Sequence, residues 1–345
     1  MICSPDSDSL PLPAAIPIAF DDNAAVYYST RLGGSSQGDF CFANMGLRTG
    51  DDKAAVRKNR AGLAKVIGCE VTVVKQVHSA KAVHISELAA IKAEAGSEAE
   101  AGSEAAESAI EEFEADGIVA GGIGCNAGCN VGCDVGCNVG CDGKPDSTES
   151  GCALGVFAAD CLPVIFSDAG SGIIAACHCG RRGLEKGIIA ATVERIKQCG
   201  GSVNRLKATL GPGICGKCYE VGQDVAERFE SIFPGTGTKT RFGGAGIDIA
   251  AAAKASLLDC SIAEENIIDS SSRIKAATAY LAEDEELKRL CLCDGEGPDL
   301  KTRLNDMENP MCTLENPLWF SHRRAFLSGK SREGRFLASV AMRTA

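Results

Sequence analysis

Two apolar runs lie close together near the middle of the chain: LGVFAADCLPVIF at residues 154–166 and GIIAACHCGRRG at residues 172–183. Short apolar runs bounded by Gly, Asp or Pro are typical of buried β-strands. A further run of this kind, VTVVKQVHS, lies upstream. The sequence therefore predicts strands over residues 71–77, 154–158, 163–167 and 173–177.

The residues that follow the second run have the spacing of a helix. Apolar side chains recur at helical spacing over residues 184–196, and Gly200 and Gly201 follow as a C-terminal stop signal. The start of this helix would point toward the end of the preceding strand, where free N–H groups and the helix dipole favour an anion. This alternation of strands and helix is consistent with an α/β fold, but it does not determine the order of the strands.

The length and composition indicate a globular protein. A chain of 345 residues with this apolar content can build a real core, in one large domain or two ordinary ones. We expect a flexible N-terminus at residues 1–15 and one large domain over residues 16–345. The N-terminal sequence lacks the pattern of a signal peptide, and no uncharged apolar stretch approaches membrane-spanning length. We therefore expect a soluble, cytoplasmic protein whose 19 cysteines are reduced.

Two low-complexity insertions interrupt the predicted domain. The first, at residues 89–114, is rich in Ala, Glu, Ser and Gly but lacks an apolar face, so we expect a solvated helix or a disordered loop. Residues 87–114 contain nine Glu and one Lys, which leaves only about −3 of the formal net charge of −11 on the rest of the chain. The acidity is therefore local.

The second insertion, at residues 121–151, contains a cysteine repeat. Five cysteines recur at a strict spacing of four, namely Cys125, Cys129, Cys133, Cys137 and Cys141. These thiols can bind soft metals, and a non-enzymatic metal-binding module built on them is one hypothesis. The alternative is a Gly-rich expansion in a surface loop, which the composition favours because Gly and Asn oppose a helix that would align the thiols.

Three potential metal ligands lie at the ends of the predicted strands. They are His78 after the upstream run, Cys161 between two strands, and His178 at the end of the next strand. One thiolate and two imidazoles suit zinc, and three protein ligands leave the fourth tetrahedral position open, as in catalytic sites. Taken singly, each residue can be explained as an ordinary buried side chain. Together they predict a zinc site and hence an enzyme.

Eight motifs, in order along most of the chain, resemble one known family. They are STRLGGSSQGDFCFANMGLRTGDD from Ser29, AAVRKNRAGL from Ala54, KQVHS from Lys75, ADGIVA from Ala115, AADCLPVIF from Ala158, AACHCGRRGL from Ala175, LGPGICGKCYEVGQDV from Leu210 and SHRR from Ser321. On these motifs the chain is identified as a member of the YfiH-type family of laccase-domain proteins. Members are regarded as purine nucleoside phosphorylases, were formerly called multicopper polyphenol oxidases, and include proteins named peptidoglycan editing factors.

The resemblance implies a fold, a metal site and an activity. The fold is an α/β layered sandwich of mixed β-sheets with flanking helices, and the family's zinc ligands correspond to His78, Cys161 and His178. The implied activity is phosphorolysis of adenosine, inosine and 5′-methylthioadenosine, which releases the base and ribose 1-phosphate, with accompanying adenosine deamination. The implied partners are purine nucleosides and inorganic phosphate. We expect no nucleic-acid or membrane partner, and a homodimer is one expectation for the assembly.

Further site residues are predicted within the motifs. Forked guanidinium groups suit phosphate, and the candidates for binding it are Arg31, Arg48, Asn59, Arg60, Arg182, Arg323 and Arg324. Asp160, which precedes Cys161, is a candidate catalytic group for proton transfer during deamination. Its alternative role is to accept hydrogen bonds from backbone N–H groups at a strand end.

The chain departs from the family pattern at three places. The family's Gly-Trp-Arg-Gly is Gly-Arg-Arg-Gly at residues 180–183, its Ser-Tyr-Arg-Arg is Ser-His-Arg-Arg at residues 321–324, and the Gly after the first ligand is Ser79. None of these changes removes a predicted ligand. The first two change the aromatic and polar groups that are available to a substrate.

A second enzymatic hypothesis uses the same residues differently. With Cys161 as a thiolate nucleophile and His178 or His78 as its base, the protein would be an amidase that edits a cell-wall peptide precursor. Firmly bound zinc would oppose this hypothesis. A copper laccase is disfavoured, because four His without a His-x-His pair cannot hold a multicopper cluster.

Overall fold

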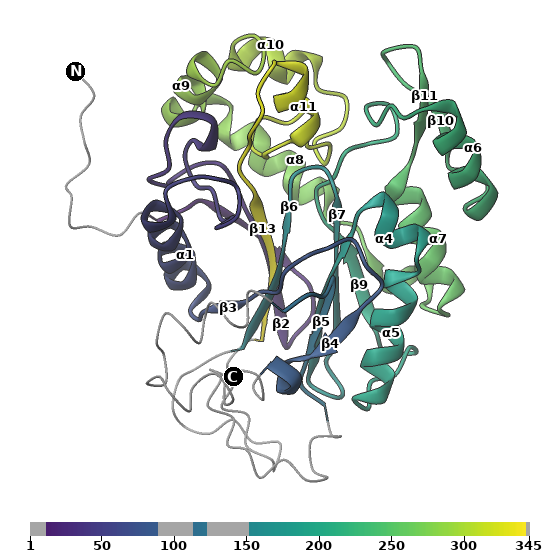
Figure 1. Cartoon of the computed structure of the whole chain (residues 1–345). Helices are drawn as coiled ribbons and strands as arrows, with labels where there is room; N and C mark the ends of the chain where they lie inside the picture. Colours follow the sequence, from purple (N-terminus) through teal and green to yellow (C-terminus); the bar gives the residue numbers. More distant parts are fainter. Residues whose placement is uncertain (1–11, 89–112, 123–151, 343–345) are drawn as a thin grey trace.

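The computed structural model describes residues 12–88, 113–122 and 152–342. Most of the two predicted insertions, including all five cysteines of the repeat, lies outside the described residues. The described parts form two large β-sheets that pack face to face, with helices on their outer faces and at one end (Figure 1). The α/β layered sandwich expected from the resemblance is confirmed.

The first sheet contains strands from both ends of the described chain. Its strand order is β1 (Ala15–Ala19), β2 (Ala24–Ser29), β13 (Phe336–Met342), β6 (Ala153–Ala158) and β3 (Val71–Thr72). All neighbours are antiparallel except β3 and β6. The β1–β2 hairpin turns at Asp21, whose Oδ1 accepts hydrogen bonds from the backbone N–H groups of Asn23 and Ala24. Such side-chain bonds to nearby backbone explain why Asp favours turns.

The second sheet contains two of the predicted strands at its centre. Its strand order is β12 (Ile267–Ile268), β9 (Lys207–Leu210), β7 (Leu162–Asp168), β8 (Ile173–Cys179), β5 (Gly117–Ala120) and β4 (Ala82–His84). Strands β7 and β8 form an antiparallel hairpin, and every residue within the two strands is buried. Their sequences are apolar without alternation because both faces of the sheet are covered.

The main hydrophobic core fills the space between the two sheets. Side chains from strands of both sheets meet there, including Val26, Val156, Ile165, Ala176 and Val340. Burial of this apolar surface is the principal favourable contribution to folding. The two sheets are therefore held face to face by residues that point inward from both.

Helices cover the outer faces of the two sheets (Figure 1). Helix α1 (Lys53–Ile67) lies against the first sheet, where Leu63 packs with Val73 and Leu337. Helices α5 (Ile188–Gln198) and α7 (Ile249–Asp259) lie against the second sheet, where their apolar residues form a second core with those of β7 and β8. The order of layers, helix, sheet, sheet and helix, follows from the need of each sheet to bury its second face.

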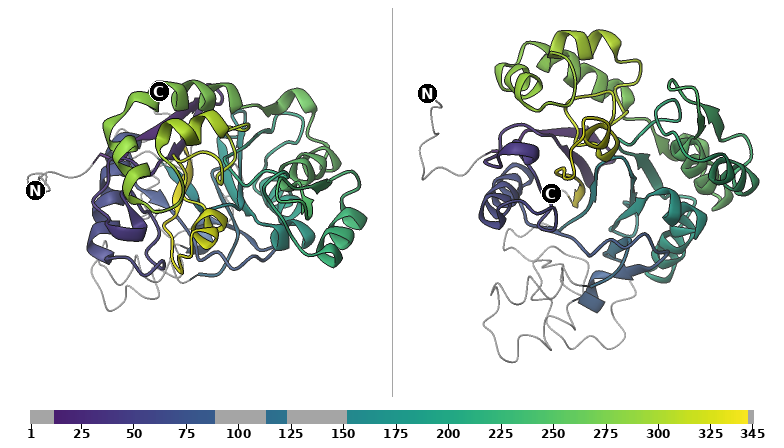
Figure 2. Two further views of the ribbon diagram at one scale, coloured as in Figure 1. Left: turned by 90° about the horizontal axis from the view of Figure 1, so that it is seen from above. Right: turned by 45° about the horizontal axis from the view of Figure 1, so that its top comes forward.

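The remaining elements lie mostly beyond one end of the sheets. They are the helices α4 (Arg181–Glu185), α6 (Gln223–Ile232), α8 (Ser271–Tyr280), α9 (Glu285–Cys293), α10 (Leu300–Asp306) and α11 (His322–Leu327), the 3-10 helices Gly38–Phe40, Glu264–Asn266 and Leu281–Glu283, and the paired strands β10 (Gly237–Lys239) and β11 (Ala245–Ile247). Figure 2 shows this end from above, with α6, β10 and β11 to one side of the C-terminal helices. None of the helices in the described ranges is long and apolar enough to cross a membrane.

Three of the four predicted strands are confirmed to within two residues at each end. The fourth, predicted over residues 71–77, is wrong beyond Thr72. There the side chain of Gln76 replaces the strand ladder, because its amide donates to the carbonyl of Phe157 and its carbonyl accepts from the N–H of Phe157. A side chain thus satisfies backbone groups that a neighbouring strand would otherwise pair.

The helix predicted over residues 184–196 is two helices. Helix α4 ends at Glu185 and α5 begins at Ile188, with Gly187 between them in the left-handed region at φ +83°. Glycine adopts this conformation without steric cost, and a single such residue ends a helix. At the N-terminus, Ala15 already belongs to β1 and pairs with Ser29, although we expected a flexible segment up to that residue.

A buried network of charges joins the residues after β2 to the C-terminal helices. The Arg31 guanidinium lies 3.2 Å from the Asp294 carboxylate and 3.1 Å from the Glu296 carboxylate. Arg324 lies 2.8 Å from Glu296, and Arg303 lies 2.7 Å from Asp294. Because all five side chains are buried, each charge depends on its partners.

We expect Glu296→Gln to lower the free energy of unfolding by roughly 3–5 kcal/mol, the usual cost of leaving a buried charge without its partner. Arg31 and Arg324 both lose their contact with the carboxylate in this variant. Denaturant unfolding followed by circular dichroism measures the change. Glu283→Gln, which removes an exposed contact with Lys288, is the control and should leave the midpoint unchanged.

The lowered pKa of Glu296 also predicts how the stability of the protein depends on pH. Burial raises the pKa of Glu296, but attraction to Arg31 and Arg324 outweighs burial and lowers the pKa from 4.5 to about 2. A depressed pKa in the folded state stabilises the protein above the unfolded pKa, and this stabilisation disappears as the pH falls toward 2. The stability difference between wild type and Glu296→Gln should therefore shrink from pH 4.5 downward, and a constant difference would contradict the assignment.

Candidate metal centre and pocket

The structure brings the three predicted metal ligands together. His78 lies in the segment before β4, Cys161 in the turn between β6 and β7, and His178 in β8. Their ligand atoms lie within 4.8 Å of one another, and Cys161 Sγ is 3.7 Å from His78 Nε2. The two imidazole rings meet edge to face, with their centroids 4.8 Å apart. One thiol and two imidazoles thus converge on one point.

The turns that carry the ligands have unusual backbone conformations. His78 has φ +57° and Asp160, which precedes Cys161, has φ +97°. Residues other than glycine adopt positive φ at a cost of about 1–3 kcal/mol and do so where the surrounding structure fixes them. In both turns, buried or half-buried carboxylates provide this constraint through hydrogen bonds to the backbone.

Asp116 fixes the first turn and orients His178. Its carboxylate accepts hydrogen bonds from the backbone N–H groups of Val77, His78 and Ser79, and from the Ser79 hydroxyl. The same carboxylate lies 3.0 Å from His178 Nδ1. Because Nδ1 is engaged in this way, Nε2 of His178 is the nitrogen available to a metal. Asp116 is fully buried immediately before β5.

The geometry of the three donors fits zinc. Zinc–sulfur and zinc–nitrogen bonds of about 2.3 Å and 2.0–2.1 Å place tetrahedral ligand atoms about 3.5 Å apart, close to the 3.7 Å between Cys161 and His78. A side chain at Gly180 would obstruct this space, since its Cβ would lie 2.7 Å from Cys161 Sγ and 2.9 Å from His78 Cδ2. Glycine at this position therefore leaves room for an ion and a further ligand.

The electrostatics of the trio favour a thiolate at Cys161. Burial raises the pKa of the Cys161 thiol, but attraction to His178 and hydrogen bonds with both imidazoles outweigh burial and lower it to about 6. Burial lowers the pKa of His178, but the Cys161 charge and the Asp116 hydrogen bond raise it to about 9. Cys161 therefore has the charge that a metal ligand or a nucleophile requires.

The trio lines a pocket with a volume of about 540 Å³, the size of a small-molecule site. Cationic groups and aromatic rings line the same pocket, namely Arg48, Arg60, Lys75, Arg181, Arg323, Arg335, His322, Phe157 and Tyr219. Guanidinium groups bind phosphate through forked hydrogen bonds, and aromatic faces stack on planar rings. The lining therefore suits a ligand that combines an anion with a planar ring.

Three of the seven residues predicted to bind phosphate line this pocket: Arg48, Arg60 and Arg323. Arg182 is exposed on α4, and its neighbour Arg181 lines the pocket instead. The sequence pattern Gly-Arg-Arg-Gly could not distinguish these two arginines, because the turn that starts α4 decides which one faces the site.

The other three predicted phosphate ligands are buried away from the pocket lining. Arg31 and Arg324 belong to the buried charge network described above. Asn59 lies in α1, where its side chain bonds the backbone N–H of Ser35 and the carbonyl of Asn44. Arg31, Arg324 and Asn59 thus make contacts within the protein and stabilise its fold.

Asp160 lines the pocket, but its carboxylate is engaged with the protein. Oδ1 accepts a hydrogen bond of 2.6 Å from the Thr313 hydroxyl, and Oδ2 accepts one of 2.6 Å from the backbone N–H of Arg323. The sequence left bonding to neighbouring backbone N–H groups as the alternative role of Asp160, but the backbone donor that bonds it is Arg323, which is distant in the chain. Through these bonds Asp160 holds the start of α11 against the turn that carries Cys161.

Sequence reasoning missed five residues on which the site depends: Asp116, Arg181, Tyr219, His322 and Glu333. His322 Nδ1 lies 3.2 Å from the Glu333 carboxylate, and this hydrogen bond raises the pKa of His322. Asp116 offered a signal, because an Asp directly before a buried apolar run indicates a functional strand end. Glu333 offered none, since only the fold brings it to His322.

The sequence matches the family model described as multi-copper polyphenol oxidoreductase laccase over residues 25–284. A purine nucleoside phosphorylase of Corynebacterium glutamicum is 31% identical over 263 residues, which cover 75% of this chain and 85% of that protein. An adenosine deaminase named RL5, from an unknown prokaryotic organism, is 36% identical over 130 residues, which cover 35% of this chain and 47% of that protein.

Solved structures have the same fold. The crystal structure of YlmD from Geobacillus stearothermophilus superposes with a TM-score of 0.61 at 23% sequence identity, and the match covers 94% of this chain and 93% of YlmD. The family match extends over most of the described residues and includes all three candidate ligands. The chain therefore belongs to the family described as multi-copper polyphenol oxidoreductase laccase, whose relatives include purine nucleoside phosphorylases.

Proposed function

We propose that the protein is a zinc-dependent purine nucleoside phosphorylase. It uses phosphate to release the base of adenosine, inosine and 5′-methylthioadenosine, leaving the sugar 1-phosphate, and it also deaminates adenosine. The observation that carries the proposal is the convergence of His78, Cys161 and His178 on a pocket lined by arginines. The names of the relatives supply the substrate class.

Arg48, Arg60 and Arg323 bind the phosphate in this proposal. The Arg60 guanidinium donates to the carbonyl of Met45 and lies 5.0 Å from the centre of the Phe157 ring. Arg323 donates to the carbonyl of Glu220 and lies 5.8 Å from the centre of the Tyr219 ring. These contacts hold the two guanidinium groups in place before phosphate binds, which reduces the conformational entropy lost on binding.

The remaining pocket residues serve the nucleoside. Phe157 and Tyr219 offer ring faces to the purine. When the bond from ribose C1′ to the base breaks, positive charge develops on the sugar and negative charge on the departing purine. We assign His322, whose pKa is raised by the hydrogen bond with Glu333, to donate a proton to that purine.

The metal centre adds electrostatic stabilisation. His78, Cys161 and His178 would hold the zinc ion, which would supply Lewis-acid chemistry to the reacting groups. Asp116 presents Nε2 of His178 to the ion by accepting the hydrogen bond from Nδ1. Asp160 is a positioning residue in this proposal, because it bonds the backbone of Arg323.

Product analysis with adenosine tests the proposal. We expect adenine and ribose 1-phosphate only in phosphate buffer, and inosine also without phosphate, with all three products lost after chelation of the metal or in His178→Ala. His84→Gln is the control, because His84 lies outside the pocket lining and bonds Ser86 and Gly121. Zinc-loaded protein without nucleoside turnover would contradict the proposed function.

We expect Asp116→Asn to weaken zinc binding by about 10–100-fold, the usual effect of losing a residue that orients a metal ligand. Competition with a chromogenic chelator measures the affinity. Asp168→Asn is the matched control, because Asp168 is an equally buried carboxylate that bonds Arg205 and the Ser202 N–H away from the site. Equal zinc affinity in both variants would show that Asp116 acts only on folding.

Substitution of the pocket arginines should affect phosphate selectively. A hydrogen bond to a charged group contributes about 1.5–3 kcal/mol, so we expect Arg60→Gln or Arg323→Gln to raise KM for phosphate by about tenfold or more. The rate of deamination, which does not use phosphate, should change much less. Arg182→Gln is the control, since Arg182 is exposed outside the pocket lining, and the same increase in that variant would exclude a local effect.

A second candidate function rests on the lowered pKa of Cys161. A thiolate 3.7 Å from an imidazole also resembles the nucleophile and base of an amidase. The editing of a cell-wall peptide precursor would be the corresponding reaction. Protein purified without stoichiometric zinc, in which iodoacetamide alkylates Cys161 and nucleosides are not converted, would favour this function over phosphorolysis.

A further inference from the structure

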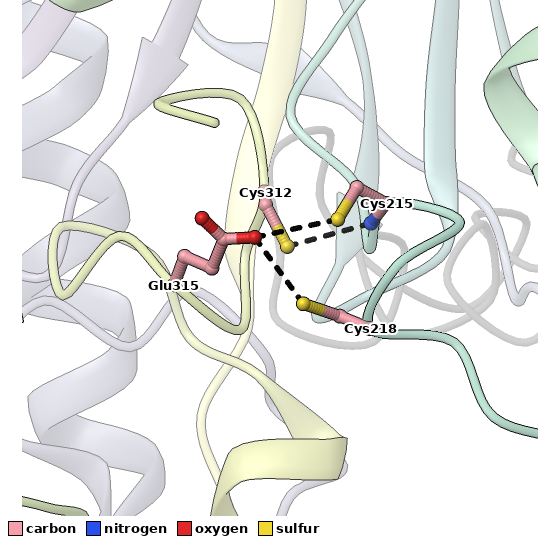
Figure 3. A group of neighbouring side chains, drawn as sticks. All are labelled: Cys215, Cys218, Cys312 and Glu315. Carbon is pink, nitrogen blue, oxygen red and sulfur yellow. Dashed lines mark hydrogen bonds between the residues drawn. The ribbon is translucent and has the colours of Figure 1, made fainter. Parts of the chain in front are cut away.

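A second group of metal-binding side chains lies outside the centre described above. Cys215, Cys218, Cys312 and Glu315 form a cluster in which one ligand atom of each residue lies within 4.8 Å of the others (Figure 3). The two cysteines of the Cys215-Gly-Lys-Cys218 turn come from the segment between β9 and α6. Cys312 and Glu315 come from the segment between α10 and α11.

The three thiols and the carboxylate point toward one another. Glu315 Oε1 lies 3.4 Å from Cys215 Sγ and 3.2 Å from Cys218 Sγ. Cys312 Sγ accepts a hydrogen bond of 3.4 Å from the backbone N–H of Cys215. Figure 3 shows all four side chains converging from two separate segments. In a tetrahedral zinc site, sulfur ligands lie about 3.8 Å apart, so small side-chain adjustments suffice to close the cluster on an ion.

The turn that carries Cys215 and Cys218 is held in a compact conformation that keeps the two thiols close together. The backbone N–H groups of Cys218 and Tyr219 both donate to the carbonyl of Cys215, at 2.9 Å each. A Cβ on Gly216 would lie 2.9 Å from Thr238 and 3.0 Å from Asp248, so a bulkier residue would push the turn away. Two cysteines separated by two residues form one half of many structural zinc sites.

Glu315 is held so that one of its oxygens faces the thiols. Its Oε2 accepts hydrogen bonds from the backbone N–H groups of Glu308 and Asn309, at 2.7 and 2.9 Å. Its Oε1 faces the cysteines and also lies 2.7 Å from the Arg241 guanidinium. The side chain is only 2% exposed. If the three thiols ionise, they and the carboxylate carry four negative charges, of which the partly exposed Arg241 balances one and a divalent cation would balance two more.

We propose that Cys215, Cys218, Cys312 and Glu315 bind a second metal ion, a soft divalent cation of the zinc class. Three thiolates select such an ion over magnesium or calcium. Four protein ligands leave no open position, which is the arrangement of a structural site. The site shares no ligand with the centre at His78, Cys161 and His178, and it does not depend on the proposed function.

The second site joins two segments that line the catalytic pocket. Between them the chain already forms an isolated β-bridge from Gly213 to Cys312. The first segment supplies Ile214 and Tyr219 to the pocket, and the second leads into α11 with Arg323. An ion that links Cys215 and Cys218 to Cys312 therefore fixes the relative position of the two segments.

Metal analysis of the full-length protein tests the proposal. After expression with zinc and purification with reductant, Cys312→Ser and Cys218→Ser should each contain one zinc equivalent less than wild type. His178→Ala should also lose one equivalent, and the double variant of His178→Ala with Cys312→Ser should lose two. Cys260→Ser is the matched control, because Cys260 is a half-buried thiol outside both groups, and it should lose none.

A conservative variant keeps the test valid if a cysteine variant fails to fold. Glu315→Gln preserves the shape of the side chain and should weaken zinc retention against a chelator by at least about tenfold, since loss of even an outer-shell partner has this effect. Cobalt added to His178→Ala should give the intense sulfur-to-metal absorption of several thiolates, and Cys312→Ser should reduce it.

Unchanged zinc content in both cysteine variants would overturn the proposal. So would mass mapping of the reduced, zinc-supplemented protein that finds a disulfide between any two of Cys215, Cys218 and Cys312. Because each comparison is a difference from wild type, zinc held by any other cysteines of the chain does not affect the result. Absence of nucleoside turnover in the zinc-loaded wild-type protein, with both zinc differences intact, would contradict the proposed function alone.

Discussion

The hydrogen bonds to the Asp116 carboxylate are the interactions on which the geometry of the candidate metal centre depends. One buried side chain accepts hydrogen bonds from three consecutive backbone N–H groups, one hydroxyl and the His178 imidazole. It therefore holds His78 in its left-handed conformation and selects the ring nitrogen that His178 presents. A carboxylate with this many donors stays charged, since the hydrogen bonds from His178 and Ser79 outweigh burial and lower its pKa to about 2.

Asp160 constrains the other side of the pocket in a comparable way. Its two carboxylate oxygens bond Thr313 and the backbone of Arg323, so the turn that carries Cys161 is tied to the start of α11. The cluster of Cys215, Cys218, Cys312 and Glu315 shares one of these segments, because Cys312 and Glu315 precede α11, whereas Cys215 and Cys218 lie between β9 and α6. The sheets thus supply the rigid support. Asp116 and Asp160 then position the segments that carry the residues of the site.

Buried charges serve two different purposes in this molecule. Arg31, Arg303 and Arg324 are neutralised by Asp294 and Glu296 and connect the C-terminal helices to the first sheet. In the pocket, Arg60 and Arg323 donate to backbone carbonyls and lie over aromatic rings, whereas Arg181 and Arg335 pair with Glu185 and Glu333. The difference lies in the partner that the fold supplies and not in the residue type.

The sequence alone predicted the strands of the central hairpin and the three candidate metal ligands, because apolar runs and ligand types are local features, and the resemblance of its motifs to a known family implied the layered α/β class. It could not separate Arg181 from Arg182 or identify Arg31 as a buried partner of Glu296, since each depends on residues distant in the chain. The second cysteine cluster was equally hidden, because Cys215 and Cys312 are 97 positions apart. Tertiary structure decided these points, since only packing of the sheets brings such distant side chains within bonding distance.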